Sequence, residues 1–270
     1  MASTDTPIAL ALPGVAGRMG RMLAGLIAES TEFQLVAATE TETSAHIGQV
    51  TGDLLGQPGS GVAISSDPAE LGQADVIVDF TRPQASMAHL QIAEATGTAL
   101  VIGTTGLSEE DEARLAAAAR KIPVLYCANT SVGVTLLSQL VRQVAASLAA
   151  DWDIEIVETH HNRKIDAPSG TALALGRAAA EGRGVSLDEV RDSGRDGETG
   201  ARPAGNIGFA VLRGGDVAGE HSVIFYGAQE RLELTHKATS RVIFARGALR
   251  AASWLAGQPA GLYSMDDVLS

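Results

Sequence analysis

Histidines and basic side chains are concentrated between Glu158 and Thr171, where the chain reads Glu-Thr-His-His-Asn-Arg-Lys-Ile-Asp-Ala-Pro-Ser-Gly-Thr. His160 and His161 are adjacent, and histidine is the side chain that most readily transfers a proton near neutral pH. The arginine and lysine that follow suit an anionic ligand, particularly a carboxylate. The Pro-Ser-Gly-Thr segment is predicted to turn into a helix, whose free N-terminal N–H groups also bind anions. The stretch therefore predicts a binding site for a small acid with a proton donor beside it.

The histidine pair has two other interpretations. It could close a strand, with one ring in the core and the other in solvent. A metal site is disfavoured because adjacent histidines in a strand point apart, no histidine follows four residues later, and no cysteine is near. Elsewhere, His89 on a predicted helix and His46 in a predicted loop are expected at the surface, whereas His221 and His236 are left open between core and pocket. Arg241 is expected where the chain crosses between domains, as a hinge or a further carboxylate contact.

A glycine-rich turn lies between two predicted strands near the start of the chain. Apolar runs at 8–12 and 34–39 predict the strands, and helically spaced apolar residues lie between them. The turn, Gly14–Gly20, has the form GxxGxxG, with Ala16 where a dinucleotide-binding turn usually has its second glycine. Glu40 ends the second strand, where a carboxylate can accept hydrogen bonds from a ribose. This context predicts a dinucleotide site.

The alternation of strands and helices continues and predicts an α/β fold with a parallel, doubly wound sheet. Ligands on such sheets bind at the carboxyl ends of the strands. Segments 103–105 and 127–130 fall at such ends and are candidates for contact with a nicotinamide, or else ordinary loops. The further strands are expected at 75–80, 99–102 and 124–128, and the helices at 84–96 and 108–121.

The pattern changes in the second half, where few helices separate the strands. This indicates a second α+β domain with a mixed or antiparallel sheet. The segment 184–205, rich in Gly, Asp, Arg and Glu, is predicted to be a mobile or assembly-related loop. The predicted domains are 1–131, completed by 241–270, and 132–240. The strands of the second domain are expected at 154–158, 207–212, 220–225 and 232–236, and helices at 135–149, 172–180 and 241–256.

Composition limits the class of partner. The 270 residues carry a formal net charge of −12, which argues against nucleic acid or an anionic membrane as a partner. No apolar run approaches the length that spans a bilayer, and the first residues lack the basic segment of a signal peptide. Cys127 is the single cysteine, which excludes an internal disulfide and fits a reducing cytoplasm.

Motifs over nearly the whole chain resemble those of the 4-hydroxy-tetrahydrodipicolinate reductases (dihydrodipicolinate reductases) of the diaminopimelate route to lysine. The most specific motif is the histidine pair followed by Lys164 and Asp-Ala-Pro-Ser-Gly-Thr, whereas a glycine-rich turn alone is common. The other matching segments are Gly-Arg-Met-Gly at 17–20, Asp-Phe-Thr at 79–81, Gly-Thr-Thr-Gly at 103–106, Asn129 with Ser-Val-Gly-Val at 131–134, Gly-Glu-His at 219–221 and His-Lys-Ala-Thr-Ser-Arg at 236–241.

The resemblance implies an oxidoreductase that uses NAD(P)H to reduce (2S,4S)-4-hydroxy-2,3,4,5-tetrahydrodipicolinate to (S)-2,3,4,5-tetrahydrodipicolinate. It implies an N-terminal Rossmann-like cofactor domain, a second domain that binds the cyclic dicarboxylate, and a homotetramer formed through the second sheet. His160 would be the proton donor and Lys164 a catalytic cation, while His161, Gly170 and Thr171 would hold substrate carboxylates. The implied cofactor contacts are Gly14, Val15, Ala16, Gly17, Arg18, Met19, Glu40, Gly103, Thr104, Thr105, Cys127, Ala128, Asn129 and Thr130. No metal is implied.

The chemistry of these residue types agrees with that reaction. Hydride addition to C4 of a conjugated imine leaves an enamine-type carbanion, which needs a proton at the neighbouring carbon. A histidine supplies such a proton near neutral pH, and fixed cations stabilise the developing negative charge.

Some positions depart from the family pattern. Many relatives carry arginine directly after the acid of the second strand, where it meets the 2′-phosphate of NADPH, but here Thr41 follows Glu40. A carboxylate favours a free 2′-hydroxyl and repels a phosphate, so NADH is the expected preference, with Arg18 leaving some use of NADPH. Thr130 replaces a common phenylalanine and Thr135 a common asparagine, which affects details of the cofactor pocket.

Two alternative functions are retained. One is another two-domain NAD(P)-dependent reductase, such as an amino-acid or aldose dehydrogenase, which would ignore the cyclic imine. The other is a non-catalytic NAD-sensing protein, which would bind NADH without turnover. The intact His160 and Lys164 argue against a sensor, because a sensor does not need a proton donor.

Overall fold

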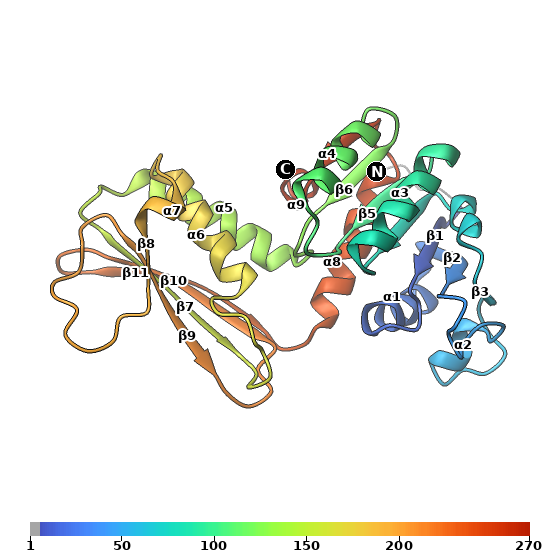
Figure 1. The fold of residues 1–270 in the computed structure, drawn as a ribbon, viewed down its shortest axis with the longest axis horizontal. Helices are drawn as coiled ribbons and strands as arrows, with labels where there is room; N and C mark the ends of the chain where they lie inside the picture. The colour runs from blue at the N-terminus through green and yellow to red at the C-terminus, as the bar shows by residue number, and fades with distance from the viewer. Residues whose placement is uncertain (1–5) are drawn as a thin grey trace. The chain divides into compact units, whose positions relative to one another are not determined.

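The chain divides into two compact units, each described separately below (Figure 1). The computed structural model describes residues 6–270. Unit 1 runs to Ser131 and resumes at Val242–Ser270, whereas unit 2 is the continuous segment Val132–Arg241. Two units with separate hydrophobic cores are expected for a chain of this length.

Unit 1 is built on a seven-stranded sheet in the order β12-β6-β5-β4-β1-β2-β3, with every neighbouring pair parallel. Strands β4 and β5 are buried at every position, as expected for a parallel sheet covered on both faces. The predicted doubly wound parallel sheet is confirmed. The strands are β1 (Ile8–Pro13), β2 (Phe33–Thr39), β3 (Ile64–Ser65), β4 (Val76–Asp79), β5 (Ala99–Ile102), β6 (Pro123–Tyr126) and β12 (Gly261–Tyr263).

Two helix pairs cover the sheet of unit 1. Helix α1 packs on α8, which also contacts β4, β5 and β6, whereas α3 packs on α4 (Figure 1). Ser108 caps α4 through its hydroxyl, which accepts the N–H of Asp111 at 3.2 Å. The helices are α1 (Arg18–Ala28), α2 (Thr51–Leu54), the 3-10 helix η1 (Pro68–Gln73), α3 (Pro83–Thr96), α4 (Glu109–Ala118), α8 (Val242–Leu255) and α9 (Met265–Val268).

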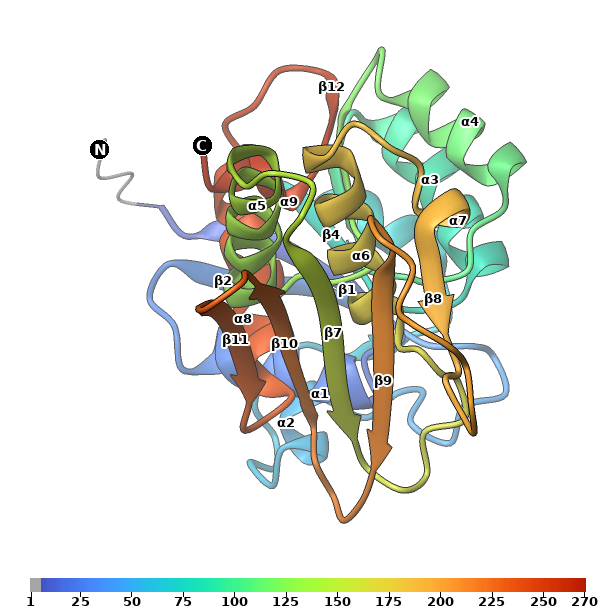
Figure 2. The ribbon, with the colours of Figure 1, turned by 90° about the vertical axis from the view of Figure 1, so that its left-hand side faces the viewer.

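Unit 2 is built on a five-stranded sheet in the order β11-β10-β7-β9-β8 (Figure 2). Strand β9 is parallel to β7 and β8, and β10 is antiparallel to β7 and β11, so the predicted second sheet is mixed. Helices α5 and α6 pack together over one face of it. The elements are α5 (Val132–Ser147), β7 (Asp153–His160), α6 (Gly170–Gly182), α7 (Leu187–Val190), β8 (Arg191–Ser193), β9 (Ile207–Arg213), β10 (Gly219–Tyr226) and β11 (Arg231–Ala238).

The core of unit 2 follows from alternation along β7. Ile154, Ile156, Glu158 and His160 are buried, and the residues between them are partly exposed. The apolar members of this set pack with α5 and α6, which places the two polar members on the same helix-covered face. Within residues 6–270, no helix of either unit has the length and hydropathy to cross a lipid bilayer.

The segment 184–205 is more structured than the predicted loop. It contains α7 and β8, and Arg195 and Arg202 bind Glu155 on the uncovered face of the sheet. Arg195 lies 2.6 Å and Arg202 2.8 Å from carboxylate oxygens of Glu155. The sequence did not indicate this because the segment has no apolar pattern, and β8 exists only through its pairing with β9.

The expectation that His89 lies at the surface is wrong. His89 is 8 % exposed, and its Nδ1 lies 2.8 Å from Oδ2 of Asp79 at the end of β4. Thr81 donates its N–H and its hydroxyl to the other oxygen of Asp79 at 2.7 and 2.6 Å. Burial disfavours the charge of Asp79, but the hydrogen bonds from His89 and Thr81 outweigh it and hold the pKa of this carboxyl below its ordinary value. The buried Ser86 and Ala93, three residues before and four after His89, show that the histidine lies on the inner side of α3.

Two glycines of α1 should respond differently to alanine. A Cβ at Gly20 would lie 2.5 Å from the carbonyl oxygen of Gly14, whereas a Cβ at Gly25 meets only Leu55 at 3.8 Å. Gly20→Ala should therefore lower the free energy of unfolding by about 1–3 kcal/mol through overpacking. Gly25→Ala should be neutral or raise it by about 0.5–1 kcal/mol, because alanine favours helix. Urea unfolding of both variants measures the difference, and equal stabilities would contradict the assigned close packing of α1 on the turn.

Candidate functional site

The loop between β9 and β10 crosses the carboxyl end of β7. Because β7 lies between β9 and β10 in the sheet, residues 214–218 pass over the point where β7 ends (Figure 2). Gly214 donates its N–H to the carbonyl of His160 at 3.0 Å, and His161 donates its N–H to the carbonyl of Val217 at 2.8 Å. These bonds fix the backbone of both histidines.

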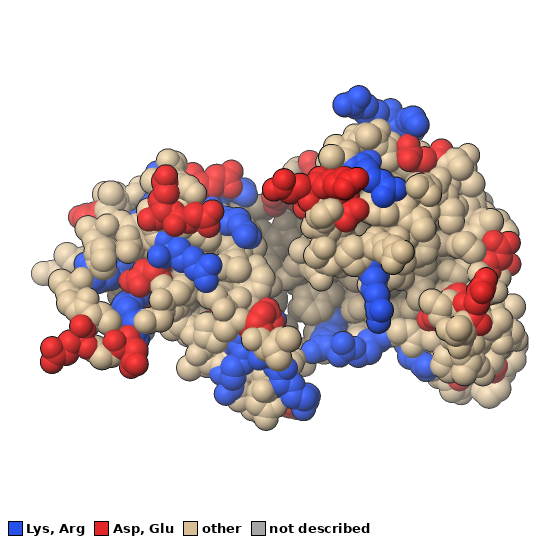
Figure 3. All heavy atoms as spheres, in the orientation of Figure 1, with Lys and Arg blue, Asp and Glu red and all other residues tan. Residues whose placement is uncertain are grey.

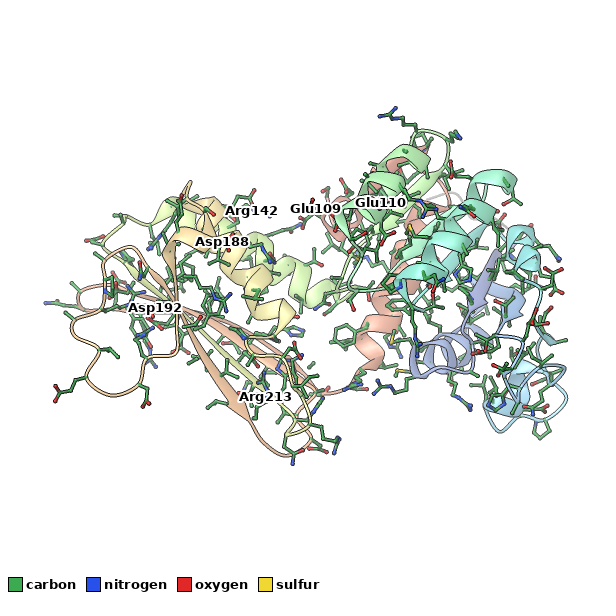
Figure 4. The ribbon with its side chains drawn as sticks, viewed as in Figure 1. Glu109, Glu110, Arg142, Asp188, Asp192 and Arg213 are labelled. Atoms are coloured by element: carbon green, nitrogen blue, oxygen red, sulfur yellow. The ribbon has the colours of Figure 1, made fainter. Side chains whose placement is uncertain are left out.

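Glu158 is a buried carboxylate with hydrogen-bond partners on both oxygens. It is 1 % exposed. Its Oε2 lies 2.6 Å from Nδ1 of His160, and its Oε1 accepts the N–H of Ser169 at 2.9 Å. Arg213, labelled in Figure 4, donates to both oxygens at 2.8 Å. One side chain therefore joins the end of β7, the end of β9 and the start of α6.

These contacts decide the ionisation of Glu158. Burial disfavours its charge, but the hydrogen bonds from Arg213, His160 and Ser169 outweigh burial and hold the pKa of the carboxyl below its ordinary value. The same contact raises the pKa of Arg213, because Glu158 accepts hydrogen bonds from the charged guanidinium. His160 thus faces a permanent anion through its Nδ1.

Nε2, the other ring nitrogen of His160, faces Gly219. A Cβ at Gly219 would lie 3.0 Å from Nε2 of His160. Gly219 also has φ +155°, a backbone conformation that L side chains rarely adopt. A side chain at this position would crowd Nε2, the ring nitrogen that does not contact Glu158, so glycine leaves space beside it.

His221 is a second buried histidine beside His160. The two rings lie edge to face with centroids 5.1 Å apart, and Nε2 of His221 is 3.0 Å from the hydroxyl of Ser169. Burial, together with the nearby charge of His160, lowers the pKa of His221 to about 4. His221 is therefore neutral near pH 7 and adds no positive charge next to His160.

The loop after β7 carries cations. Nζ of Lys164 lies 2.8 Å from Asp166, and this hydrogen bond lowers the pKa of the Asp166 carboxyl. Nη2 of Arg241 lies 3.2 Å from Nε2 of His161, and desolvation together with the charges of Arg241 and Arg163 lowers the pKa of His161. Figure 3 shows basic side chains gathered at the end of unit 2 where β7 and β9 finish. This end of the sheet suits an anionic ligand.

The start of α6 lies next to these cations. Ser169 is the N-cap, and its hydroxyl accepts the N–H of Ala172 at 3.1 Å. Gly170 is exposed, and a Cβ there would meet nothing within 4 Å. With Thr171 it begins α6, and the positive end of the helix dipole at this terminus attracts anions. The helix terminus therefore has both the polarity and the open space for a carboxylate.

In unit 1, the glycine-rich turn and Glu40 lie together. Gly14 has φ +66° and donates its N–H to the carbonyl of Thr39 at 2.8 Å. Oε1 of Glu40 accepts the N–H of Ala16 at 3.0 Å, which places the carboxylate against the turn. A depression of about 180 Å³ is lined by the turn and by Phe80, and includes the predicted contacts Gly14, Gly17, Arg18 and Met19. Val15, in contrast, is fully buried, so only its backbone can contact a ligand.

The other predicted cofactor contacts follow β5 and β6, which are neighbours in the sheet. A Cβ at Gly103 would overlap the ring of Phe80, so only glycine fits there. Thr104 is 3 % exposed and accepts the hydroxyl hydrogen of Ser86 at 2.9 Å, which commits its side chain to the interior. Thr105 is exposed and reaches solvent.

The segment after β6 mixes interior and exposed positions. Burial raises the pKa of the Cys127 thiol to about 12, so it stays protonated and unreactive. Ala128 is exposed, and the Asn129 side chain accepts the N–H of Ser131 at 2.9 Å. Thr130 is 1 % exposed and donates its hydroxyl to the carbonyl of Phe244 in α8 at 2.7 Å. Threonine in place of the family's phenylalanine thus holds α8, and its contact with a cofactor stays a prediction.

Sequence reasoning missed several residues around His160. The contact of Glu158 with His160 could have been predicted, since residues two apart on a strand share a face. Arg213 had no such signal, because its position depends on strand register. Ser169 belongs to the predicted anion-binding turn, and His221, for which the sequence leaves core and pocket open, lies beside His160. Register places His160 opposite Arg213 in β9 and Glu158 opposite His221 in β10. Within residues 6–270, no three His, Cys, Asp or Glu side chains are grouped as a metal site requires.

The lowered pKa of His221 predicts a pH-dependent stability. Between about pH 6.5 and pH 4 the unfolded chain binds a proton at this histidine and the folded chain does not. The free energy of unfolding should therefore fall by about 3 kcal/mol as the pH is lowered through this window. His221→Gln should lack this contribution. Urea unfolding of both proteins at several pH values tests the assignment, and identical pH dependence would contradict it.

Comparisons with known proteins agree over the whole chain. The family model "Dihydrodipicolinate reductase, N-terminus" matches residues 8–130, and "Dihydrodipicolinate reductase, C-terminus" matches residues 133–269. A 4-hydroxy-tetrahydrodipicolinate reductase of Rhodopseudomonas palustris (strain BisB18) is 55% identical over 261 residues, which cover 96% of each chain. One from Ruegeria sp. (strain TM1040) is 49% identical over 267 residues, covering 98% of this chain and 99% of the relative.

Solved structures show the same fold. A dipicolinate-bound dihydrodipicolinate reductase from Paenisporosarcina sp. TG-14 matches with a TM-score of 0.75 at 24% identity, covering 96% of this chain and 98% of that one. An amine dehydrogenase from Mycobacterium smegmatis matches with a TM-score of 0.61 at 17% identity, covering 97% and 96%. With both family models matched and relatives about half identical over nearly their full length, the chain belongs to the dihydrodipicolinate reductase family.

Proposed function

We propose that this protein reduces (2S,4S)-4-hydroxy-2,3,4,5-tetrahydrodipicolinate to (S)-2,3,4,5-tetrahydrodipicolinate with NAD(P)H, in the diaminopimelate route to lysine. Membership of the reductase family supports the reaction. The observation that carries it in the structure is His160, whose Nδ1 contacts a buried carboxylate while its Nε2 faces a glycine. A ring held in this way can deliver a proton through Nε2.

The residues of unit 2 account for binding and proton transfer. Lys164, His161 and the first turn of α6 at Gly170 and Thr171 would hold the two carboxylates of the substrate. Loss of the substrate's 4-hydroxyl group as water would leave a conjugated imine, whose C4 accepts the hydride. His160 would then give its Nε2 proton to the neighbouring carbon, and Lys164 would stabilise the negative charge that develops there. Reduced nicotinamide supplies the hydride when it is bound.

The residues of unit 1 fit a dinucleotide. Gly14 adopts a positive φ, and a Cβ there would lie 3.0 Å from Thr81, so this position requires glycine, as the tight turn of a dinucleotide site does. Glu40 lies against the turn and retains acceptor capacity for ribose hydroxyls. Because a carboxylate repels the 2′-phosphate and Thr41 supplies no cation, we infer a preference for NADH over NADPH.

We also infer a homotetramer formed through the second sheet. The face of that sheet without helices exposes Leu212 by 55 % and Tyr226 by 36 %, and exposed apolar side chains on a sheet favour association. The single cysteine and the net charge of −12 fit a cytoplasmic enzyme whose ligands are small molecules rather than nucleic acid or membrane.

Removal of the proposed proton donor should affect turnover and not cofactor binding. His160→Ala is expected to lower kcat by about tenfold or more, because the carbanion must then take its proton from water. The affinity for NADH, measured by fluorescence titration, should stay within about twofold, since His160 belongs to unit 2. Equal kcat in variant and parent would remove the role assigned to His160.

A coupled assay tests reaction and cofactor together. Pyruvate, aspartate semialdehyde and the condensing synthase generate the substrate in place, and NADH or NADPH consumption is followed in parallel. We expect faster turnover with NADH, and Thr41→Arg should raise kcat/KM for NADPH by about tenfold, because arginine pairs with the 2′-phosphate. Turnover only with NADPH would overturn the cofactor preference. NADH binding without consumption would favour a sensor, and turnover of amino acids or sugars another reductase.

A further inference from the structure

We propose that Glu158, held by Arg213, is a positioning residue of the reduction: its carboxylate orients His160 for proton donation and fixes the start of the substrate-binding turn at Ser169. This inference rests on the proposed function, because it assigns a task to a residue that would not touch the substrate. It extends the site by a carboxylate on β7 and a guanidinium on β9.

The geometry separates the tasks of the two carboxylate oxygens. Oε2 lies 2.6 Å from Nδ1 of His160, and Oε1 accepts the N–H of Ser169 at 2.9 Å. A carboxylate accepts hydrogen bonds and donates none, so neutral His160 must carry its proton on Nδ1. Nε2 is then the nitrogen that takes up and releases the catalytic proton.

Arg213 keeps that carboxylate charged and in place. It donates to both oxygens of Glu158 at 2.8 Å and to the carbonyl of Asp166 at 2.7 Å. The guanidinium therefore offsets the desolvation of Glu158, and it also ties the loop after β7 to β9. Without Arg213, the carboxylate would keep its contact with His160 and would attract a positive charge on that ring more strongly.

Charged and titratable groups surround His160 from several elements. Glu158 on β7 and Arg213 on β9 face Nδ1. His221 on β10 lies beside the ring, and the charges of His236 on β11 and Lys164 in the loop reach His221 as well. Glu158 is the anion in direct contact with the His160 ring, so its removal should produce the largest change in the pH dependence of the rate.

Glu158→Gln keeps nearly the same side-chain shape, so it tests how the carboxylate orients His160 without disturbing the packing around it. Its amide oxygen can still accept the N–H of Ser169, so the KM of the dicarboxylate should change by less than about threefold. Its amide NH₂ then faces Nδ1 of His160 as a donor, which reverses the tautomer and removes the anion. We expect kcat to fall by about tenfold or more, and the rate to decline at a pH about one unit lower than in the parent.

Arg213→Met is expected to shift the pH profile of the rate to higher pH, opposite to the shift expected for Glu158→Gln. With the competing guanidinium removed, Glu158 attracts the positive charge on the His160 ring more strongly, so the rate should decline at a pH about one unit higher than in the parent, and kcat should fall because the ring gives up its proton less readily. Glu181→Gln is the matched control, since Glu181 pairs with Arg142 at 2.9 Å on the surface of the same unit. That variant should keep both the parent's rate and its pH profile.

The tautomer provides a readout that does not need turnover. ¹⁵N NMR of the imidazole nitrogens, with the His160 signals assigned by their loss in His160→Ala, should show an Nδ1–H tautomer in the parent and an Nε2–H tautomer in Glu158→Gln. A carboxylate that only packs loops together would leave the tautomer unchanged and would shift the pH profiles of both variants in the same direction or not at all. Either result would overturn the proposal.

The two proposals fail differently. If the parent does not reduce the cyclic imine, the proposed function fails, and the NMR comparison still decides whether Glu158 sets the tautomer. If the parent is active but Glu158→Gln keeps its rate, profile and tautomer, only the role of Glu158 fails. If thermal melting shows that Glu158→Gln does not fold, Arg213→Met decides, because a decline at the parent's pH or lower contradicts the proposal.

Discussion

The buried charge of Glu158 is the constraint on which the second unit's site depends. A carboxylate at 1 % exposure is tolerated only when charged or strongly polar donors replace its water. Arg213, His160 and the N–H of Ser169 supply those donors. Since the donors come from three separate parts of the chain, satisfying one side chain also fixes the positions of two strand ends and a helix start.

Unit 1 contains a similar arrangement at the end of β4. Asp79 is fully buried and accepts hydrogen bonds from Thr81, while the ring of His89 lies at its second oxygen. Thr104, after β5, lies 3.4 Å from the same carboxylate. In each unit, a buried carboxylate paired with a histidine holds the segments that follow neighbouring strands. This arrangement holds irregular backbone on a rigid scaffold, as a precise site requires.

Features encoded in a few consecutive residues were predictable. The glycine turn, the flanking strands and Glu40 lie within one continuous segment, and the contact between Glu40 and Ala16 follows from that strand-turn-helix-strand order. The burial of His89 was misjudged because a polar residue on a helix reads as solvent-facing unless its partner, Asp79, is known. Likewise, β8 has no apolar pattern, and its pairing with β9 defines it as a strand.

The sequence by itself therefore determined the α/β class, the division into a parallel sheet and a second, mixed or antiparallel sheet, and the stretch that carries the histidines and cations. Apolar periodicity and glycine spacing are local properties, which explains this success. The tertiary structure decided which groups meet His160. Arg213 lies 53 positions and His221 61 positions further along the chain, and only the register of β9 and β10 beside β7 brings them to the ring. Strand register is a collective result of packing one face of the sheet, so no single segment encodes it.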